Sequence, residues 1–300
     1  MKGIILAGGA GSRLYPLTTV VTKQLQPVYD KPMIYYPLSL LMLGGIKEVL
    51  LISTTQDIPF FQRLLKDGSQ LGIKIEYAVQ EHPRGIPEAF LIGEDFIKGD
   101  DVALILGDNL LHGDMNFYRK AIKEQIAKEN GLNARVFAYS VSDPERYGVV
   151  EFDKRSRKVL SIEEKPKAPK SSYAIPGLYL FDSTASERAK KLKPSPRGET
   201  EIVELIKSYL VDGKLGVSVI DRGIAWLDMG TPRSLLESGE YVGAIEERQG
   251  LKIACIEEVA LRMGFLNEAT FKKTMEMIPR SPYKDYLERI LTEIQEKNGL

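Results

Sequence analysis

A glycine-rich loop with one arginine stands near the start of the chain, and its residues could hold phosphate groups. Residues 3–16 read GIILAGGAGSRLYP, so an apolar run ends at Gly8, Gly9, Gly11, Ser12 and Arg13. Backbone N–H groups exposed by glycine and a bidentate guanidinium are donors that suit anionic phosphate oxygens. The alternative is a purely structural turn. We interpret the segment as a phosphate-binding loop at the end of a strand.

The spacing of this loop argues against two common phosphate-binding motifs. A dinucleotide-binding loop needs G-x-G-x-x-G at the start of a helix, but Leu14 stands at the third glycine position and Pro16 follows it. The second strand of such a fold should end in an acidic residue, and Ser53 stands there instead. The pattern G-x-x-x-x-G-K-[ST] has no match. A nicotinamide-dependent oxidoreductase is therefore disfavoured.

Further charged residues stand where they could complete a phosphate site. Lys23 follows the loop, and Asp108 ends the apolar run of LILGDN. Ligands of open parallel sheets bind outside the carboxyl ends of the strands, and a carboxylate suits Mg²⁺. Asp108 could equally be a turn residue, because Asp and Asn favour turns. Later segments add three charged residues that each also fit a solvated or turn position: Lys165, Arg197 and Asp228.

Alternating strand-like and helix-like stretches predict the scaffold for these residues. Apolar, β-branched runs occupy 3–7, 46–53, 73–79, 102–107 and 134–141. Helix-like stretches separate them at 32–43, 57–71, 87–97 and 116–129. Continuous apolar strands that alternate with helices indicate an α/β fold whose parallel sheet is covered on both faces.

The pattern changes after residue 145. Strand-like segments at 148–153, 158–165 and 177–182 have little helix between them, and two helical stretches, 184–192 and 199–211, precede a strand at 215–220. The tail from 231 to 300 is helical, with apolar residues three and four positions apart. One such stripe predicts core or subunit packing: Leu287, Ile290, Leu291 and Ile294.

Composition limits the classes of partner. The 300 residues include 41 Lys plus Arg and 41 Asp plus Glu, so no overall charge attracts nucleic acid or an anionic membrane. Cys255 is the single cysteine, which excludes an internal disulfide and a Cys-rich metal site, and we expect a buried thiol. We see no signal peptide and no apolar run near the ~20 residues of a membrane span. We therefore expect a soluble, cytoplasmic protein.

Taken in order, the motifs closely resemble those of the glucose-1-phosphate thymidylyltransferases, over essentially the whole chain. The glycine loop and LGDN are shared by the wider sugar-phosphate nucleotidylyltransferase family, whereas YDKPMIYYPLS and DPERYGVVEFD are specific to this branch. The resemblance implies a Rossmann-like, mixed but mostly parallel sheet flanked by helices. It implies a nucleotidyltransferase core at 1–230, with an inserted sugar-binding β region at about 140–225, and a helical region at 231–300 for oligomerisation.

The resemblance also implies a reaction in which glucose-1-phosphate attacks the α-phosphorus of dTTP and yields dTDP-glucose and pyrophosphate. Asp108 and Asp228 would bind Mg²⁺. Catalytic contacts to the phosphates would come from Arg13, Lys23, Lys165 and Arg197. The nucleotide would be bound by Leu6, Gly8, Gly9, Gly11, Ser12, Gln24, Gln80, Gly85 and Asp108, with the two glutamines on the thymine edge. The sugar would lie against Tyr147, Gly148, Glu164 and Tyr179.

The residue types suit this chemistry independently of the resemblance. A phosphate monoester loses its second proton near a pKa of about 6, so the attacking oxygen needs no general base at neutral pH. The chain has only two histidines, His82 and His112, and neither stands in an evident relay. The difficulty is to bring two anions together, so catalysis should depend on alignment and charge neutralisation.

Three residues depart from the common family pattern: Glu88 replaces Gln, Pro176 replaces Thr and Met229 replaces Thr. A carboxylate cannot donate the hydrogen bonds that an amide donates, so Glu88 leaves open UTP or another nucleotide as the donor. A non-catalytic nucleotide-sensing paralogue is a further alternative. It should have lost metal-binding or cationic residues, which are present here.

The helical tail resembles a family region that supports a homotetramer and, in many members, a second nucleotide site for feedback by dTDP-rhamnose. Arg222 and Arg262 match positions that would hold phosphates in that site. Ordinary surface or interface ion pairs are the alternative role for both arginines.

Overall fold

The centre of the molecule is a long sheet built around β1 (Lys2–Leu6), seen in a computed structural model that describes residues 1–9, 11–196 and 198–298. Parallel neighbours of β1 are β4 (Glu48–Ser53) on one side and β6 (Val102–Leu106) on the other. Beyond β4 lies β5 (Lys74–Val79), again parallel. The strand order therefore reverses direction at β1, which is where open α/β sheets bind ligands.

The other half of the sheet is mixed. Strand β12 (Leu178–Phe181) is antiparallel to both β6 and β8 (Ala134–Ser140), and β13 (Leu215–Val219) pairs with β8 in parallel. The sheet continues antiparallel through β11 (Tyr173–Ala174), β9 (Gly148–Phe152) and β10 (Val159–Glu164). Only β10, β11 and β12 run against the other described strands of this sheet. The predicted Rossmann-like, mostly parallel sheet is confirmed.

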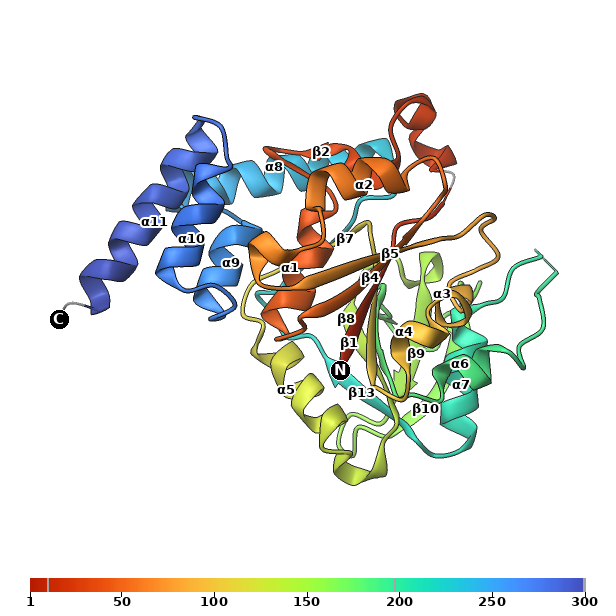
Figure 1. Cartoon of the computed structure of the whole chain (residues 1–300). Coiled ribbons are helices and arrows are strands. Elements are labelled where there is room, and N and C mark those ends of the chain that lie inside the picture. The colour runs from red at the N-terminus through yellow and green to blue at the C-terminus, as the bar shows by residue number, and fades with distance from the viewer. Residues whose placement is uncertain (10, 197, 299–300) are drawn as a thin grey trace.

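Helices cover both faces of the sheet, because successive residues of each strand point to opposite sides. Ile5 packs in one core with α1 (Tyr35–Leu43), α2 (Ile58–Leu65) and α5 (Asn116–Ile126). Ile4 packs in a second core on the opposite face, and Figure 1 shows the helices of that side together: α3 (Glu88–Ile92), α4 (Glu94–Ile97), α6 (Ala185–Ala189) and α7 (Ile202–Val211). Burial on both faces explains the continuous apolar strands.

Four helices of the described residues form the C-terminal part: α8 (Pro232–Gln249), which runs along the top of Figure 1, and α9 (Ile256–Arg262), α10 (Glu268–Glu276) and α11 (Pro282–Asn298) on its left. Three residues of the predicted stripe on the last helix are buried in the same core as Ile5, namely Leu287, Ile290 and Leu291, and Ile294 is partly buried against it. The helical tail therefore extends the core of the sheet. Within the described residues, no helix is long and apolar enough to cross a membrane.

Short elements refine the sequence prediction. The expected helix at 57–71 ends at Leu65 and is followed by a 3-10 turn, and the one at 87–97 is divided at Gly93. Two strand pairs were not predicted: β2 (Pro27–Val28) with β3 (Lys31–Pro32), and β7 (Asn109–His112) with β14 (Ala225–Asp228). The 3-10 turn after Leu65 is Ser69–Leu71, and further described 3-10 turns are Ser12–Leu14, Leu17–Thr19, Lys23–Leu25, Glu129–Gly131 and Pro144–Arg146.

A third apolar cluster packs the β7–β14 pair against helix α8. Leu110 of β7 and Met229, which follows β14, are fully buried against Val242 of α8. Helix α8 is joined to the β2–β3 hairpin by the buried ion pair between Lys31 Nζ and Glu246 Oε1, at 2.7 Å. Met229, one of the departures from the family pattern, is therefore a packing residue of this cluster.

The close approach of the C-terminal part to the sheet can be tested at Gly72. A Cβ at Gly72 would lie 2.3 Å from the carbonyl oxygen of Phe265, and its φ is +67°. Gly213 has the same φ of +67° but no atom within 4 Å of an added Cβ. We expect Gly213→Ala to cost about 1–2 kcal/mol of unfolding free energy for the left-handed backbone. Gly72→Ala should cost more, as measured by urea unfolding, and equal losses would contradict the close contact.

Candidate active site

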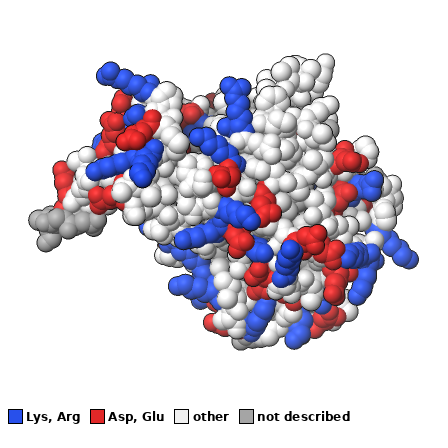
Figure 2. All heavy atoms as spheres, viewed as in Figure 1, with Lys and Arg blue, Asp and Glu red and all other residues white. Residues whose placement is uncertain are grey.

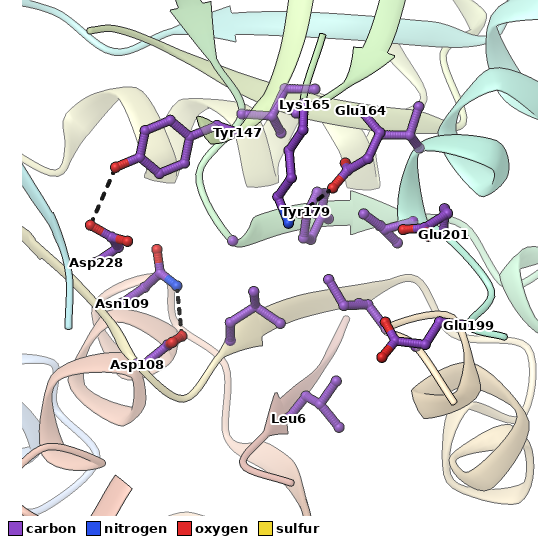
Figure 3. Close-up of a pocket in the computed structure, with 18 of the residues that line it drawn as sticks. Leu6, Asp108, Asn109, Tyr147, Glu164, Lys165, Tyr179, Glu199, Glu201 and Asp228 are labelled. Carbon is purple, nitrogen blue, oxygen red and sulfur yellow. Dashed lines mark hydrogen bonds and ion pairs between the residues drawn. The ribbon is translucent and has the colours of Figure 1, made fainter. Parts of the chain in front are cut away.

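A cavity of about 340 Å³ opens at the carboxyl ends of β1 and β6. Figure 3 shows Asp108 and Asp228 at one end of it, Glu199 and Glu201 at the other, and Lys165 projecting between them. The structure brings most of the predicted residues to this one space: Leu6, Gly8, Arg13, Gln80, Gly85, Asp108, Tyr147, Gly148, Glu164, Lys165, Tyr179 and Asp228. The predicted residue Arg197 lies outside the described residues.

The antiparallel β7–β14 pair places the two aspartates together. Asp228 is the register partner of Asn109, and the backbone N–H of Met229 donates to the carbonyl oxygen of Asp108 at 2.9 Å. Side-chain bonds then fix the pair, because Asn109 Nδ2 donates to Asp108 Oδ1 at 3.2 Å and Trp226 Nε1 donates to Asn109 Oδ1 at 2.6 Å. Trp226 therefore supports Asp108 through Asn109.

Opposite charges surround these carboxylates. Lys23 Nζ donates to Asp108 Oδ2 at 2.5 Å, and Arg146 lies 3.9 Å from Asp228 Oδ2. Burial raises the pKa of Asp228; Arg146 opposes this shift, and the negative charge of Asp108 adds to it. The hydroxyl of Tyr147 donates to Asp228 Oδ1 at 3.3 Å.

The donor set at this end suits magnesium. Over the described ranges, no group of three or more His, Cys, Asp or Glu side chains could hold a metal ion on its own. Mg²⁺ is commonly held by one or two carboxylates together with substrate phosphates and water. Asp108 and Asp228 fit that pattern, because both line the cavity.

The glycine loop forms the wall beside the aspartates. Gly11 has a φ of +56° and its carbonyl accepts a hydrogen bond from Thr18 Oγ1 at 3.1 Å, which folds the loop back on itself. Arg13 is exposed and lies along Gly230, where an added Cβ would come 2.7 Å from Nη2. Gly9 and Lys23 line a neighbouring polar cavity of about 410 Å³. Ser12 is exposed in the turn after Gly11.

Gln80 and Gly85 bound the end of the cavity near β5. Gly85 has a φ of +105°, and an added Cβ would lie 2.0 Å from the carbonyl oxygen of Thr200, so glycine is required there. Gln80 Nε2 donates to Glu88 Oε2 at 2.7 Å. Glu88 therefore contacts Gln80, which makes it a neighbour of the predicted base-reading residue. Gln24 is 3% exposed, accepts a hydrogen bond from Thr22, and is absent from the described walls of both cavities.

The opposite wall carries the residues predicted for the sugar. Gly148 and Glu164 are register partners in the β9–β10 pair, and Lys165 Nζ lies 3.5 Å from Glu164 Oε1. Burial raises the pKa of Tyr179, with Glu164 and Asp108 adding to the shift. Burial, with Asp228 second, raises the pKa of Tyr147 to about 12. Both tyrosines therefore carry their hydroxyl proton at neutral pH and can donate hydrogen bonds.

Several lining residues were missed by the sequence prediction: Asn109, Arg146, Glu199, Thr200 and Glu201. Arg146 stands directly before Tyr147 in DPERYGVVEFD, and this adjacency was the available signal. The register of β7 with β14, which gives Asn109 its role, has no signal in the local pattern.

The two candidate regulatory arginines lie in different hollows. Arg222 lines a cavity of about 870 Å³ beside α5 and β13, whereas Arg262 lines a surface hollow of about 470 Å³ near Ile294. Arg262 Nε donates to Glu258 Oε1 at 2.6 Å. The structure of the single chain does not bring them into one site. Cys255 is 1% exposed, and burial raises the pKa of its thiol, as predicted for an inert buried cysteine.

Two carboxylates, a glycine loop and several cations around one cavity define an α/β enzyme that acts on phosphate groups. The sequence profile described as nucleotidyl transferase matches residues 2–243. Similar curated proteins include a glucose-1-phosphate thymidylyltransferase of Neisseria meningitidis, 52% identical over 97% of this chain and 99% of that one. Another, from Mycobacterium tuberculosis, is 48% identical over the same shares. The chain belongs to the nucleotidyl transferase family, in the branch of the glucose-1-phosphate thymidylyltransferases.

Solved structures agree with this assignment. A putative glucose-1-phosphate thymidylyltransferase from Bacillus anthracis, crystallised with sucrose, has a TM-score of 0.74 at 41% identity and covers 80% of this chain and 94% of its own. A UDP-glucose pyrophosphorylase bound to UDP-glucose has a TM-score of 0.71 at 20% identity, over 83% of this chain and 99% of its own. The second likeness shows the shared fold alone.

The raised pKa of Asp228 predicts a stability cost that substitution should remove. Its charged form is disfavoured in the folded state, so stability falls as pH rises through the folded pKa. With metal chelated, we expect Asp228→Asn to raise the unfolding free energy at pH 7. The gain should shrink as pH falls from the raised folded pKa toward the unfolded value of about 3.9.

Asp153→Asn is the control with the opposite sign. Hydrogen bonds from Ser156 lower the pKa of Asp153, so its loss should destabilise the protein at pH 7. Denaturant unfolding at several pH values measures both variants. A destabilised Asp228→Asn protein at pH 7 would contradict the electrostatic account of the site.

Proposed function

We propose that the chain transfers a thymidylyl group from dTTP to glucose-1-phosphate, giving dTDP-glucose and pyrophosphate. The observation that carries the proposal is one cavity with three parts: a glutamine and glycine end, an aspartate end and a wall of tyrosine and glutamate. These parts suit a nucleobase, a set of phosphates and a sugar, respectively. The relatives at about half identity carry the same activity in their names.

Asp108 and Asp228 are the proposed ligands of Mg²⁺. When bound, the ion would neutralise negative charge on the phosphate oxygens. The chain holds the two carboxylates ready through the β7–β14 pair and the bonds from Asn109 and Tyr147. Lys23 pairs with Asp108 in the chain alone and would exchange that carboxylate for a phosphate oxygen when substrate binds.

The remaining residues align the two substrates. Arg13 extends along Gly230 at the edge of the cavity and would hold the departing pyrophosphate, while Lys165 and Arg197 would hold the sugar phosphate. Glu164, Gly148, Tyr147 and Tyr179 would contact the sugar, with the Tyr179 hydroxyl as a donor and the Glu164 carboxylate as an acceptor. No general base is required, because the attacking phosphate oxygen is already ionised at neutral pH.

The donor nucleotide is the part of this proposal for which there is an alternative. Uracil presents the same hydrogen-bonding edge as thymine and differs by one methyl group, so UTP is the second candidate. A methyl-sized difference in a pocket is worth only about 1–3 kcal/mol of discrimination. Some activity with UTP is therefore compatible with a thymidylyltransferase.

A matrix of nucleoside triphosphates against sugar phosphates, read by pyrophosphate release with Mg²⁺, tests the function. We expect the highest kcat/KM for dTTP with glucose-1-phosphate. Asp108→Asn should lower it by about 10²–10³, the loss typical of one preorganised electrostatic contact. Asp153→Asn, at an exposed turn outside the described lining of the cavity, is the matched control and should retain activity. Release no greater than that of Asp108→Asn would overturn the proposal.

We also propose a homotetramer. Figure 2 shows an uncharged protrusion at the upper right, where Figure 1 draws the N-terminal loops in red. Exposed apolar side chains of that segment include Tyr15, Leu17 and Val20, at 74%, 50% and 82% exposure. Adjacent apolar surfaces of this kind favour burial between subunits.

Regulation and location complete the proposal. Arg222 and Arg262 are proposed for a second nucleotide site in the dTDP-rhamnose pathway on the family resemblance, and their separate hollows give that site no support within one chain. The substrates are multiply charged metabolites that do not cross membranes unaided, so we place the reaction in the cytoplasm.

A further inference from the structure

Gln80 has a side chain whose orientation decides what the nucleobase end of the cavity can bind. It follows β5, its backbone N–H donates to Ser53 O at 2.8 Å, and it is only 4% exposed while still lining the cavity. An amide side chain has two donors on nitrogen and an acceptor oxygen. The Gln80 side chain therefore presents either its acceptor oxygen or its donor nitrogen to the cavity, depending on the orientation of the amide.

Glu88 fixes that choice. Its Oε2 accepts from Gln80 Nε2 at 2.7 Å and from the backbone N–H of Arg84 at 3.2 Å. The Arg84 guanidinium lies 4.0 Å from the other carboxylate oxygen. An ionised carboxylate can only accept hydrogen bonds, so Gln80 must turn its nitrogen toward Glu88.

The amide oxygen of Gln80 then points to the glycine loop. An added Cβ on Gly8 would lie 2.6 Å from Gln80 Oε1, so the absence of a side chain on Gly8 provides the room for this oxygen. Gly8 and Gln80 both line the cavity. The oxygen is therefore an acceptor at the wall of the nucleobase end.

We infer that Glu88 is a positioning residue for base selection: it holds Gln80 with its oxygen toward the cavity and so favours a pyrimidine that donates a hydrogen bond from N3. Thymine and uracil carry an N3–H, whereas N3 of cytosine is an acceptor and would face the Gln80 oxygen unfavourably. This inference rests on the proposed function, because it assumes that a pyrimidine nucleotide occupies this end.

This arrangement gives a role to Glu88, which stands where the family commonly has Gln. Gln, the common family residue, can donate as well as accept, so it allows Gln80 either orientation. Glu at position 88 allows only one orientation of the Gln80 amide. Glu at this position therefore sharpens selection for a base with an N3–H donor. Glu88 acts through Gln80 and does not need to contact the base itself.

The test compares kcat/KM for dTTP and dCTP, with glucose-1-phosphate as acceptor, in the unsubstituted protein, Glu88→Gln and Arg84→Gln. We expect Glu88→Gln to lower the dTTP-to-dCTP ratio by about threefold to tenfold, the range of one net hydrogen bond. Arg84→Gln removes the 4.0 Å ion pair but keeps the Gln80–Glu88 bond, so its ratio should stay unchanged. A purely structural role of Glu88 would lower both kcat/KM values equally and leave the ratio unchanged.

Binding of dTDP and dCDP by isothermal titration calorimetry provides a second measurement that needs no turnover. The same fall in the affinity ratio is expected for Glu88→Gln, with a thermal melt to confirm folding. An unchanged ratio in active Glu88→Gln, or an equal fall in Arg84→Gln, overturns the inference and leaves the proposed function intact. An unsubstituted protein that releases no pyrophosphate from dTTP overturns the proposed function, and the binding ratio then decides the inference separately.

Discussion

The pairing of β7 with β14 is the contact on which the site depends. It joins segments that are far apart in the chain, with Trp226 and Asn109 bonded across 117 positions, and it sets Asp228 beside the end of β6. Leu110 and Met229 anchor the pair in an apolar cluster under α8. Without this short ladder the two carboxylates would belong to unrelated loops. The packing of α8 and the placement of the two carboxylates are therefore linked.

Charge balance governs the rest of the cavity. Burial raises the pKa of Asp228 and the negative charge of Asp108 adds to the shift, while Lys23 and Arg146 compensate the two carboxylates in the chain alone. Such a site is preorganised for electrostatic stabilisation at some cost in folding free energy, which is typical of active sites.

The sequence predicted the central strands β1, β4, β6 and β8 well because they are buried on both faces and therefore largely apolar. The glycine loop and Asp108 could be placed because they follow such strands. Strands β7 and β14 were not predicted, because NLLH and AWLD are only four residues long and pair with a segment far away in the sequence. Burial of Gln24 and the bond from Gln80 to Glu88 depend on tertiary packing, which no local spacing reveals. The sequence pattern identified candidate site residues by their type and position, whereas the side chains that they contact are known only from the structure.

The most direct test of this account is the affinity for Mg²⁺, titrated calorimetrically into the protein saturated with dTDP-glucose. If the β7–β14 pair makes one metal-binding site from Asp108 and Asp228, Asp108→Asn and Asp228→Asn should each weaken Mg²⁺ binding strongly, while Asp153→Asn binds as the unsubstituted protein does. Unchanged Mg²⁺ affinity in either active-site variant would contradict the central claim, because that carboxylate would then not be a ligand.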